Sequence, residues 1–264
     1  MRAIDHQPYL RAEQYHTAAN LDARISMHQR FSQNSYGVPR WLFDQVDARS
    51  THMFEIGCGS GNIWQENAAR MPDHWQLTLC DFSRGMVAQA QQNLAAAGVA
   101  ARYLVADAQE LPLQEATFDA AFAHFMLYHV PDRCRALGEL RRVLKPGGRL
   151  YAATNGRQHL SELFDLAQQF DAQFNGWRNS ASESFKIENG AAQLAAHFSK
   201  VTLLPYHDEL LISDPEAVVS YIASFAPLSV AQQADFSAFV RDAFNLNGGV
   251  LRVTKASGLF IAEC

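Results

Sequence analysis

Three glycines, each separated by one residue, stand where an apolar run gives way to a helix-compatible segment. They are Gly57, Gly59 and Gly61, preceded by Met53–Ile56 and followed by 62–70. Because glycine lacks a Cβ atom, such a turn bends sharply and lets the backbone approach a ligand closely, while the following helix presents free N–H groups. The order of strand, glycine turn and helix is typical of a nucleotide-type binding site.

The glycine spacing is that of G-x-G-x-G, whereas dinucleotide folds use G-x-G-x-x-G. The third glycine, Gly61, therefore arrives one residue early. This spacing disfavours an NAD-dependent oxidoreductase. Tight binding of NADH rather than SAM would favour that alternative again.

Acidic or polar residues follow each of the next apolar runs. Asp81 ends the run Leu77–Cys80, 22 residues after Gly59, where a carboxylate can accept both hydroxyls of a ribose. The later matches are Asp107 after Tyr103–Ala106, His124 after Phe118–Ala123, and the string Leu144-Lys-Pro-Gly-Gly-Arg-Leu150.

With these motifs the chain resembles the class I S-adenosylmethionine (SAM) dependent methyltransferases. Their first motif, acidic-x-Gly-x-Gly-x-Gly, stands here as Glu55–Gly61, and the resemblance covers about 51–155. The segment His124–Asp132 also resembles the ubiquinone/menaquinone-type and small-molecule members. The resemblance implies SAM as the cofactor, with S-adenosylhomocysteine as the product.

The resemblance also implies a role for each matched position. The methionine end of SAM would be bound by Glu55, Gly57, Cys58, Gly59, Gly61 and His124, and its ribose by Asp81. The face of the adenine ring would contact Phe82 and Met86, and the edge of the adenine ring would contact Asp107 and Ala108. For Phe82 and Met86 the alternative is plain core packing. For Asp81 and Asp107 it is helix capping or turn formation.

Three residues are candidates for acid–base catalysis. His129 is the first, because imidazole titrates in the range that a general base needs. A structural histidine that holds its loop to the next helix is the alternative, and for His129 this reading is preferred. His124 and Tyr15 are the other two candidates, and packing of the N-terminal helix is the alternative for Tyr15.

Alternating strand and helix signals predict an α/β fold, a Rossmann-like, seven-stranded and mainly parallel sheet with helices on both faces and a helical lid. We expect one methyltransferase domain over 1–264. Its parts are an N-terminal helical cap (1–46), the SAM-binding core (51–155), a sixth strand with helical lid insertions (156–249) and a final antiparallel strand region (250–264), read as a hairpin or bent strand around 255–258. Local signals also predict a turn at Pro146–Gly148, a loop over 175–184 that contains Trp177, the sixth strand at Lys200–Leu204, and helices capped by Asp214 and Ser229.

The composition is that of an ordinary globular protein, with 48% hydrophobic and 19% charged residues. A net charge of −5 gives no general attraction to nucleic acid or to an anionic membrane, and no apolar run approaches the roughly 20 residues of a membrane span. A basic cluster at Arg133–Lys145 is interpreted as the solvent face of a helix. The four cysteines show no C-x-x-C spacing and the ten histidines no His-x-x-x-His, so neither a metal site nor a disulfide is expected. We expect a cytoplasmic protein, monomer or homodimer.

The sequence thus predicts methyl transfer from SAM to an O, N or C atom of a small organic metabolite. It lacks the Asp/Asn-Pro-Pro-Tyr string that grips flat amides and the Pro-Cys pair of cytosine C5 enzymes. An RNA or protein methyltransferase, which needs a basic recognition surface, and a non-catalytic SAM-binding regulator stay open as alternatives.

Overall fold

The computed structural model of the 264-residue chain describes residues 19–174, 183–224 and 228–264, with side chains from residue 25 onward. In these ranges one sheet holds the strands β1 (His52–Ile56), β2 (Gln76–Asp81), β3 (Ala101–Val105), β4 (Phe118–His124), β5 (Leu144–Asn155), β6 (Lys200–Ile212) and β7 (Leu251–Glu263). The helices are α2 (Ala19–Phe31), α3 (Val38–Asp44), α4 (Asn62–Glu66), α5 (Arg84–Ala96), α6 (Arg133–Val143), α7 (Ser161–Phe170), α9 (Ile187–Ala195), α10 (Pro215–Ala223) and α11 (Val230–Leu246), with 3-10 turns η3 (Ala68–Arg70) and η4 (Leu127–His129).

The strand order is β3-β2-β1-β4-β5-β7-β6, and the pairs from β3 to β5 are parallel. β7 pairs antiparallel with β5 on one side and β6 on the other. The predicted seven-stranded, mainly parallel α/β sheet is therefore confirmed. Its carboxyl edge, where β1, β2 and β4 end, is where ligands of such sheets bind.

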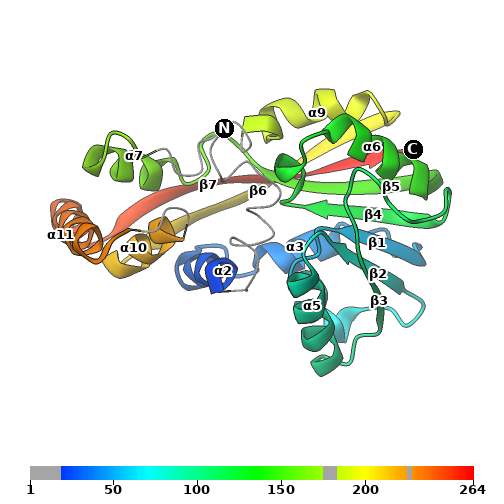
Figure 1. Cartoon of the computed structure of the whole chain (residues 1–264), viewed down its shortest axis with the longest axis horizontal. Helices are drawn as coiled ribbons and strands as arrows, with labels where there is room; N and C mark the ends of the chain where they lie inside the picture. Colours follow the sequence, from blue (N-terminus) through cyan, green and yellow to red (C-terminus); the bar gives the residue numbers. More distant parts are fainter. Residues whose placement is uncertain (1–18, 175–182, 225–227) are drawn as a thin grey trace.

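Two apolar clusters fill the space on the two faces of the sheet. On one face α6 and α9 pack through Leu137, Leu140 and Leu194 against Phe54 and Phe260. On the other, α3, α4 and α5 bury side chains that include Phe43, Trp64 and Leu94 against Phe122 and Tyr151. Figure 1 shows α6 and α9 on the opposite side of the sheet from α3 and α5.

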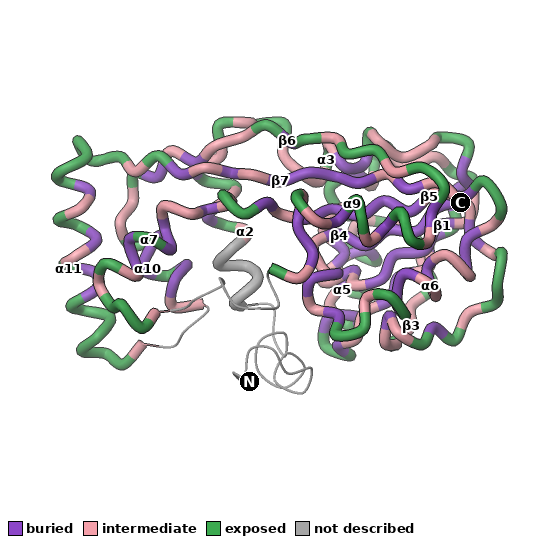
Figure 2. Tube along the Cα trace, turned by 90° about the horizontal axis from the view of Figure 1, so that it is seen from above, coloured by how far each residue is buried: buried purple, intermediate pink, exposed green. Residues whose placement is uncertain are grey.

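The strands β6 and β7 run far beyond the rest of the sheet, and a third apolar cluster surrounds their extension. This cluster joins α2, α7, α10 and α11 to residues such as Leu210 and Val253 on the two strands. Figures 1 and 2 show these helices gathered around the long β6–β7 ribbon, away from β1 to β3. The ribbon thus links the cofactor-type core to a helical lobe.

The free edge of β6 is covered by the segment that joins α2 to α3. Ser32 bridges Leu210, and the Gln33 N–H donates to the Glu209 carbonyl at 3.0 Å. Such cover protects an edge strand from pairing with other chains. It also fixes α2 beside the ribbon.

The final strand is antiparallel, as predicted. The hairpin considered at 255–258 is wrong, because β7 is continuous and hydrogen-bonded on both sides. A Cβ on Gly258 would lie 3.0 Å from the Leu204 carbonyl oxygen, so this glycine serves close strand packing rather than a turn. The strand expected at Lys200–Leu204 likewise continues past Pro205 to Ile212, since an edge strand tolerates a proline.

Local signals located the starts of α10 and α11. Asp214 accepts a bond from the Glu216 N–H at 3.0 Å with Pro215 in the first turn, and Ser229 forms a capping box with Gln232. The turn expected at Pro146–Gly148 is a bulge inside β5, where the register moves from Leu144 to Arg149. Trp177 and most of the loop predicted over 175–184 lie outside the described residues.

Candidate functional site

The glycine turn joins β1 to α4 and needs its glycines for two separate reasons. Gly57, Gly59 and Gly61 have φ values of 71°, 53° and 78°, which residues with a Cβ rarely adopt. A Cβ on Gly57 would also lie 2.7 Å from Cγ of Met126, and one on Gly61 would collide with Leu94. The turn is therefore specific to glycine, as the motif predicts. The predicted helix over 62–70 is shorter, because α4 ends at Glu66 and the η3 turn follows.

Asp81 lies at the carboxyl end of β2 and is bonded to the glycine turn. Its Oδ2 accepts from the Gly59 N–H at 3.0 Å, and its Oδ1 accepts from the Ser83 N–H at 2.8 Å. Burial raises the pKa of Asp81, the nearby Glu55 adds to the rise, and the backbone N–H bonds oppose it. A carboxylate offers about four acceptor sites, so beside the backbone N–H groups of Gly59, Phe82 and Ser83 the side chain can still accept from a ligand hydroxyl.

Glu55, the acidic residue of the first motif, is buried between two side chains. Its Oε2 accepts from Trp64 Nε1 at 2.6 Å, and its Oε1 lies 3.0 Å from His124 Nδ1. Glu55 is 3% exposed and His124 is 8% exposed. These contacts hold β1, α4 and β4 together and fix the His124 ring.

Within the described part of the chain, the other nitrogen of His124 is free to bond a polar ligand. Among the described residues, Nε2 of His124 is buried without a hydrogen-bond partner. Buried polar atoms are nearly always paired, so an unpaired one close to the glycine turn favours a polar ligand group there. The Glu55, His124 and glycine-turn arrangement thus fits the amino acid end of SAM.

The adenine-side residues follow β2 and β3. Asp107 accepts from the Gln109 backbone N–H at 2.9 Å and from its side chain at the same distance, so it shapes a turn. Met86 is 2% and Ala108 4% exposed, whereas Phe82 keeps part of its surface open. The structure brings these residues to the same edge as Asp81, and their contacts with an adenine stay predictions.

The loop after β4 holds the proposed catalytic histidine. Phe125 adopts φ 54°, an uncommon value for a residue with a bulky side chain, and redirects the chain into η4. The rings of Tyr128 and His129 meet edge to face at 4.6 Å, and the His129 N–H donates to the Met126 carbonyl. His129 therefore lies in a packed loop near the carboxyl edge, which suits a base and a structural residue equally. Tyr15 lies outside the described residues.

The basic residues around α6 are engaged by their neighbours. Arg142 pairs with Glu139 at 2.7 Å and Lys145 with Asp119 at 2.7 Å. The neighbouring Arg133 donates to the Val130 carbonyl. These pairs support the interpretation of a solvated helix face.

Cysteine and metal chemistry find no support in the described residues. All four cysteines are free, and burial raises the pKa of the Cys80 thiol to about 12, which makes it inert. Within the described ranges there is no group of three His, Cys, Asp or Glu residues placed to hold a metal ion. In the same ranges no helix has the length and apolarity to cross a bilayer.

Sequence reasoning missed a second polar cluster, on the β6–β7 ribbon. Lys255 and Asp208 form an ion pair of 2.5 Å with side chains only 6% and 0% exposed, and the rings of His28 and His159 stack nearby at 5.9 Å. Charged residues in two strongly apolar strands were the available signal, because a buried charge in a strand requires a partner.

Comparison with known proteins places the glycine turn in a family. Residues 54–152 match the family model described as a methyltransferase domain. The ubiquinone/menaquinone biosynthesis C-methyltransferase UbiE of Geotalea daltonii is 36% identical over 123 residues, covering 44% of this chain and 52% of that protein. The malonyl-[acyl-carrier protein] O-methyltransferase of Serratia marcescens is 33% identical over 124 residues, covering 46% and 45%. The chain thus spans about half the length of these relatives.

Solved structures agree in fold. The putative methyltransferase BH2331 of Bacillus halodurans has a TM-score of 0.58 at 14% identity, covering 85% of this chain and 97% of that one. Phosphoethanolamine N-methyltransferase 2 of Haemonchus contortus, solved with SAM, has a TM-score of 0.60 at 17% identity, covering 97% and 59%. At such identities only the fold is shared.

Together these matches confirm the resemblance to the class I SAM-dependent methyltransferases. Residues 54–152 match a methyltransferase domain, and the chain shares the fold of the solved methyltransferases.

Proposed function

We propose that this protein transfers the methyl group of SAM to a small organic acceptor. The observation that carries the proposal is the joint anchoring of the family's motif residues at one edge. Gly59 is bonded to Asp81, and Glu55 is bonded to His124, whose second nitrogen is left for a ligand.

The residues of this edge have separable tasks. SAM supplies an electrophilic methyl group on a sulfonium. The glycine turn lets the backbone approach the ligand, Asp81 accepts from its ribose hydroxyls, and His124 offers its free nitrogen to the amino acid end. Placing an acceptor in line with the methyl group contributes about 7 to 11 kcal/mol in favourable cases, so no covalent intermediate on the protein is needed.

A small acceptor is preferred over a macromolecule on charge. The net charge is −5, and Arg142, Lys145 and Arg133 around α6 are engaged by Glu139, Asp119 and a backbone carbonyl. An RNA-binding surface needs unpaired basic groups gathered on one face. The relatives named above act, by their names, on carbon, oxygen and nitrogen, so their names leave the acceptor atom open.

Calorimetric titration with SAM and with S-adenosylhomocysteine tests the cofactor site. The chain is then incubated with methyl-labelled SAM and cell extracts separated into metabolite, RNA and protein fractions. Label in the metabolite fraction supports the proposal, and label in RNA or protein supports the alternative. Binding without any transfer indicates a regulatory SAM-binding protein, and absence of binding overturns the site.

A further inference from the structure

One face of the β6–β7 ribbon carries a row of polar side chains beyond the carboxyl end of β5. Cross-strand pairing places Tyr206 opposite Ser257 and Asp208 opposite Lys255. Residues paired in this way project from the same face of a sheet. Ser257 in turn lies opposite Asn155, two residues beyond Ala153, the register partner of His124. The row therefore begins two strands away from the proposed cofactor site, on the same edge.

Two histidines from distant parts of the chain meet at this row. His28 comes from α2, and His159 comes from the segment between β5 and α7; their rings are nearly parallel, with an interplanar angle of 26°. Nδ1 of His159 lies 3.4 Å from the Ser257 hydroxyl, which donates to Asn155 at 2.8 Å. Both histidine residues are partly exposed.

Two buried polar atoms in this region have no partner among the described residues. They are Nδ1 of His28 and the hydroxyl of Tyr206. Tyr206 is 4% exposed, with its ring packed on Trp41 at 5.1 Å. An unpaired buried donor or acceptor costs free energy that a ligand hydrogen bond would recover.

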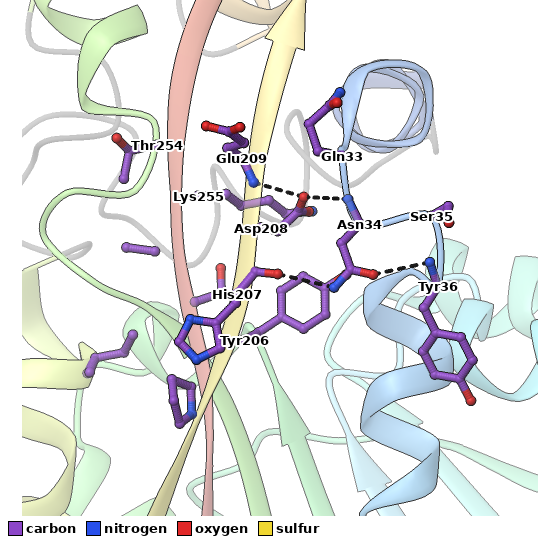
Figure 3. A pocket seen from close by; sticks show the side chains of 14 residues that line it. Gln33, Asn34, Ser35, Tyr36, Tyr206, His207, Asp208, Glu209, Thr254 and Lys255 are labelled. Carbon is purple, nitrogen blue, oxygen red and sulfur yellow. Dashed lines mark hydrogen bonds and ion pairs between the residues drawn. The ribbon is translucent and has the colours of Figure 1, made fainter.

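Tyr206, Lys255 and Ser257 line a groove of about 850 Å³, which is large enough for a small organic ligand. Figure 3 shows the groove between β6 and the 33–36 segment, with Asn34 bonded to the Asp208 carboxylate and the His207 carbonyl.

The charges at this site are already neutralised inside the protein. The Asp208 carboxylate accepts from Lys255, from the Ser32 hydroxyl and from the Asn34 N–H, so it is not available to a cationic ligand. Burial and the charge of Lys255 lower the pKa of His28 to about 3. Burial lowers the pKa of His159 well below its usual value, and the neighbouring His28 and Lys255 add to this effect. Both imidazoles are therefore neutral near pH 7.

One side of the neutral imidazoles is aromatic and apolar. Tyr221 meets the His28 ring edge to face at 6.4 Å and belongs to the third apolar cluster together with Met27 and Leu160. A ligand with a largely apolar body and one uncharged polar group matches this environment.

We propose that His28 and His159, with Tyr206, bind an uncharged hydroxyl group on an aromatic methyl acceptor. This assignment rests on the proposed function for its reaction, but the binding site itself can be tested without turnover. The imidazole and phenol groups would form hydrogen bonds with the acceptor hydroxyl, and the apolar walls would hold its ring.

The test uses a matched series of naphthalene probes with the full chain saturated with S-adenosylhomocysteine. The probes are 1-naphthol, 1-methoxynaphthalene, 1-naphthylmethylamine as a cation and 1-naphthoate as an anion. Binding is followed by NMR of the histidine ring signals. We expect saturable shifts of the His28 and His159 signals with 1-naphthol, and affinities at least about tenfold weaker for the other three probes, the loss expected for one unpaired buried group.

Three variants separate a hydrogen-bonding role from a packing role. His28→Phe keeps an aromatic ring and should weaken 1-naphthol binding about tenfold, while His28→Asn, which retains a polar atom near Nδ1, should restore part of it. His74→Phe, on the exposed surface before β2, is the matched control and should change nothing. Affinity for S-adenosylhomocysteine should stay within about twofold in all three.

Equal binding of the naphthol and the methyl ether, or unchanged binding in His28→Phe, would overturn the proposal. Preference for the amine or the carboxylate would also overturn it. If the protein fails to bind S-adenosylhomocysteine, the proposed function fails, while the naphthol series without the cofactor product still decides the acceptor site.

Discussion

Replacing Asp81 with Ala should weaken SAM binding and loosen the glycine turn together. The carboxylate accepts from the Gly59 and Ser83 N–H groups, and we assign its remaining lone pairs to the ribose. A hydrogen bond to a charged group contributes about 1.5 to 3 kcal/mol, so the loss of the ribose contact predicts roughly 10- to 100-fold weaker binding. Asp81→Asn keeps one acceptor oxygen, so its SAM affinity should fall between those of the wild type and Asp81→Ala.

The stability effect of the same change should be small, about 1 to 3 kcal/mol. The backbone N–H groups of Gly59, Phe82 and Ser83 lose their acceptor, but the raised pKa of Asp81 shows that burying this charge already has a cost. Calorimetry with SAM and urea unfolding measure the two effects separately. Asp73→Ala, which removes an exposed acid before β2, is the control.

The raised pKa also sets a pH dependence for Asp81. The folded protein takes up the proton at a higher pH than a free aspartate, so SAM affinity should begin to fall above the usual aspartate range. The sign for stability is opposite: the folded state holds this proton more tightly than the unfolded chain, so this group alone favours folding as pH falls through its folded pKa. Unchanged SAM affinity in Asp81→Ala, or an acid limb missing in the wild type, would refute the assigned pocket.

Three further changes have expected outcomes. Lys255→Met leaves the buried Asp208 charge without its cation and should cost about 3 to 5 kcal/mol in urea unfolding, whereas adding Asp208→Leu should recover much of it. Gly57→Ala places a Cβ against Met126 at a positive φ and should abolish SAM binding in calorimetry, with partial recovery in Gly57→Ala/Met126→Ala. Asp214→Ala removes the cap of α10 and should lower the free energy of unfolding by about 1 kcal/mol.

The parts of the fold that local chemistry determines were predicted from sequence. The glycine turn and the capped starts of α10 and α11 depend on residues within a few positions of one another. The glycines tolerate positive φ, and Asp and Ser side chains cap helix ends. Such signals survive without knowledge of the tertiary structure.

The ribbon and its polar row could not be predicted in the same way. Gly258 was interpreted as a turn residue because glycine often marks turns, but its role depends on strand neighbours more than 50 residues away, Leu203 and Leu204. His28 and His159 are 131 positions apart, and no spacing rule joins them. Only the fold brings such residues together.

The cofactor site could be predicted and the ribbon could not, because the two regions bind different kinds of ligand. A site for a constant cofactor can be built from turns and strand ends, which short motifs encode. An acceptor site has to be supplied by elements outside that core, and here α2, the segment after β5 and the extended ribbon contribute His28, His159 and Tyr206. The buried Lys255–Asp208 pair and the Asn34 contact fix α2 against the ribbon, so the same interactions that stabilise the helical lobe also set the geometry of the proposed acceptor site.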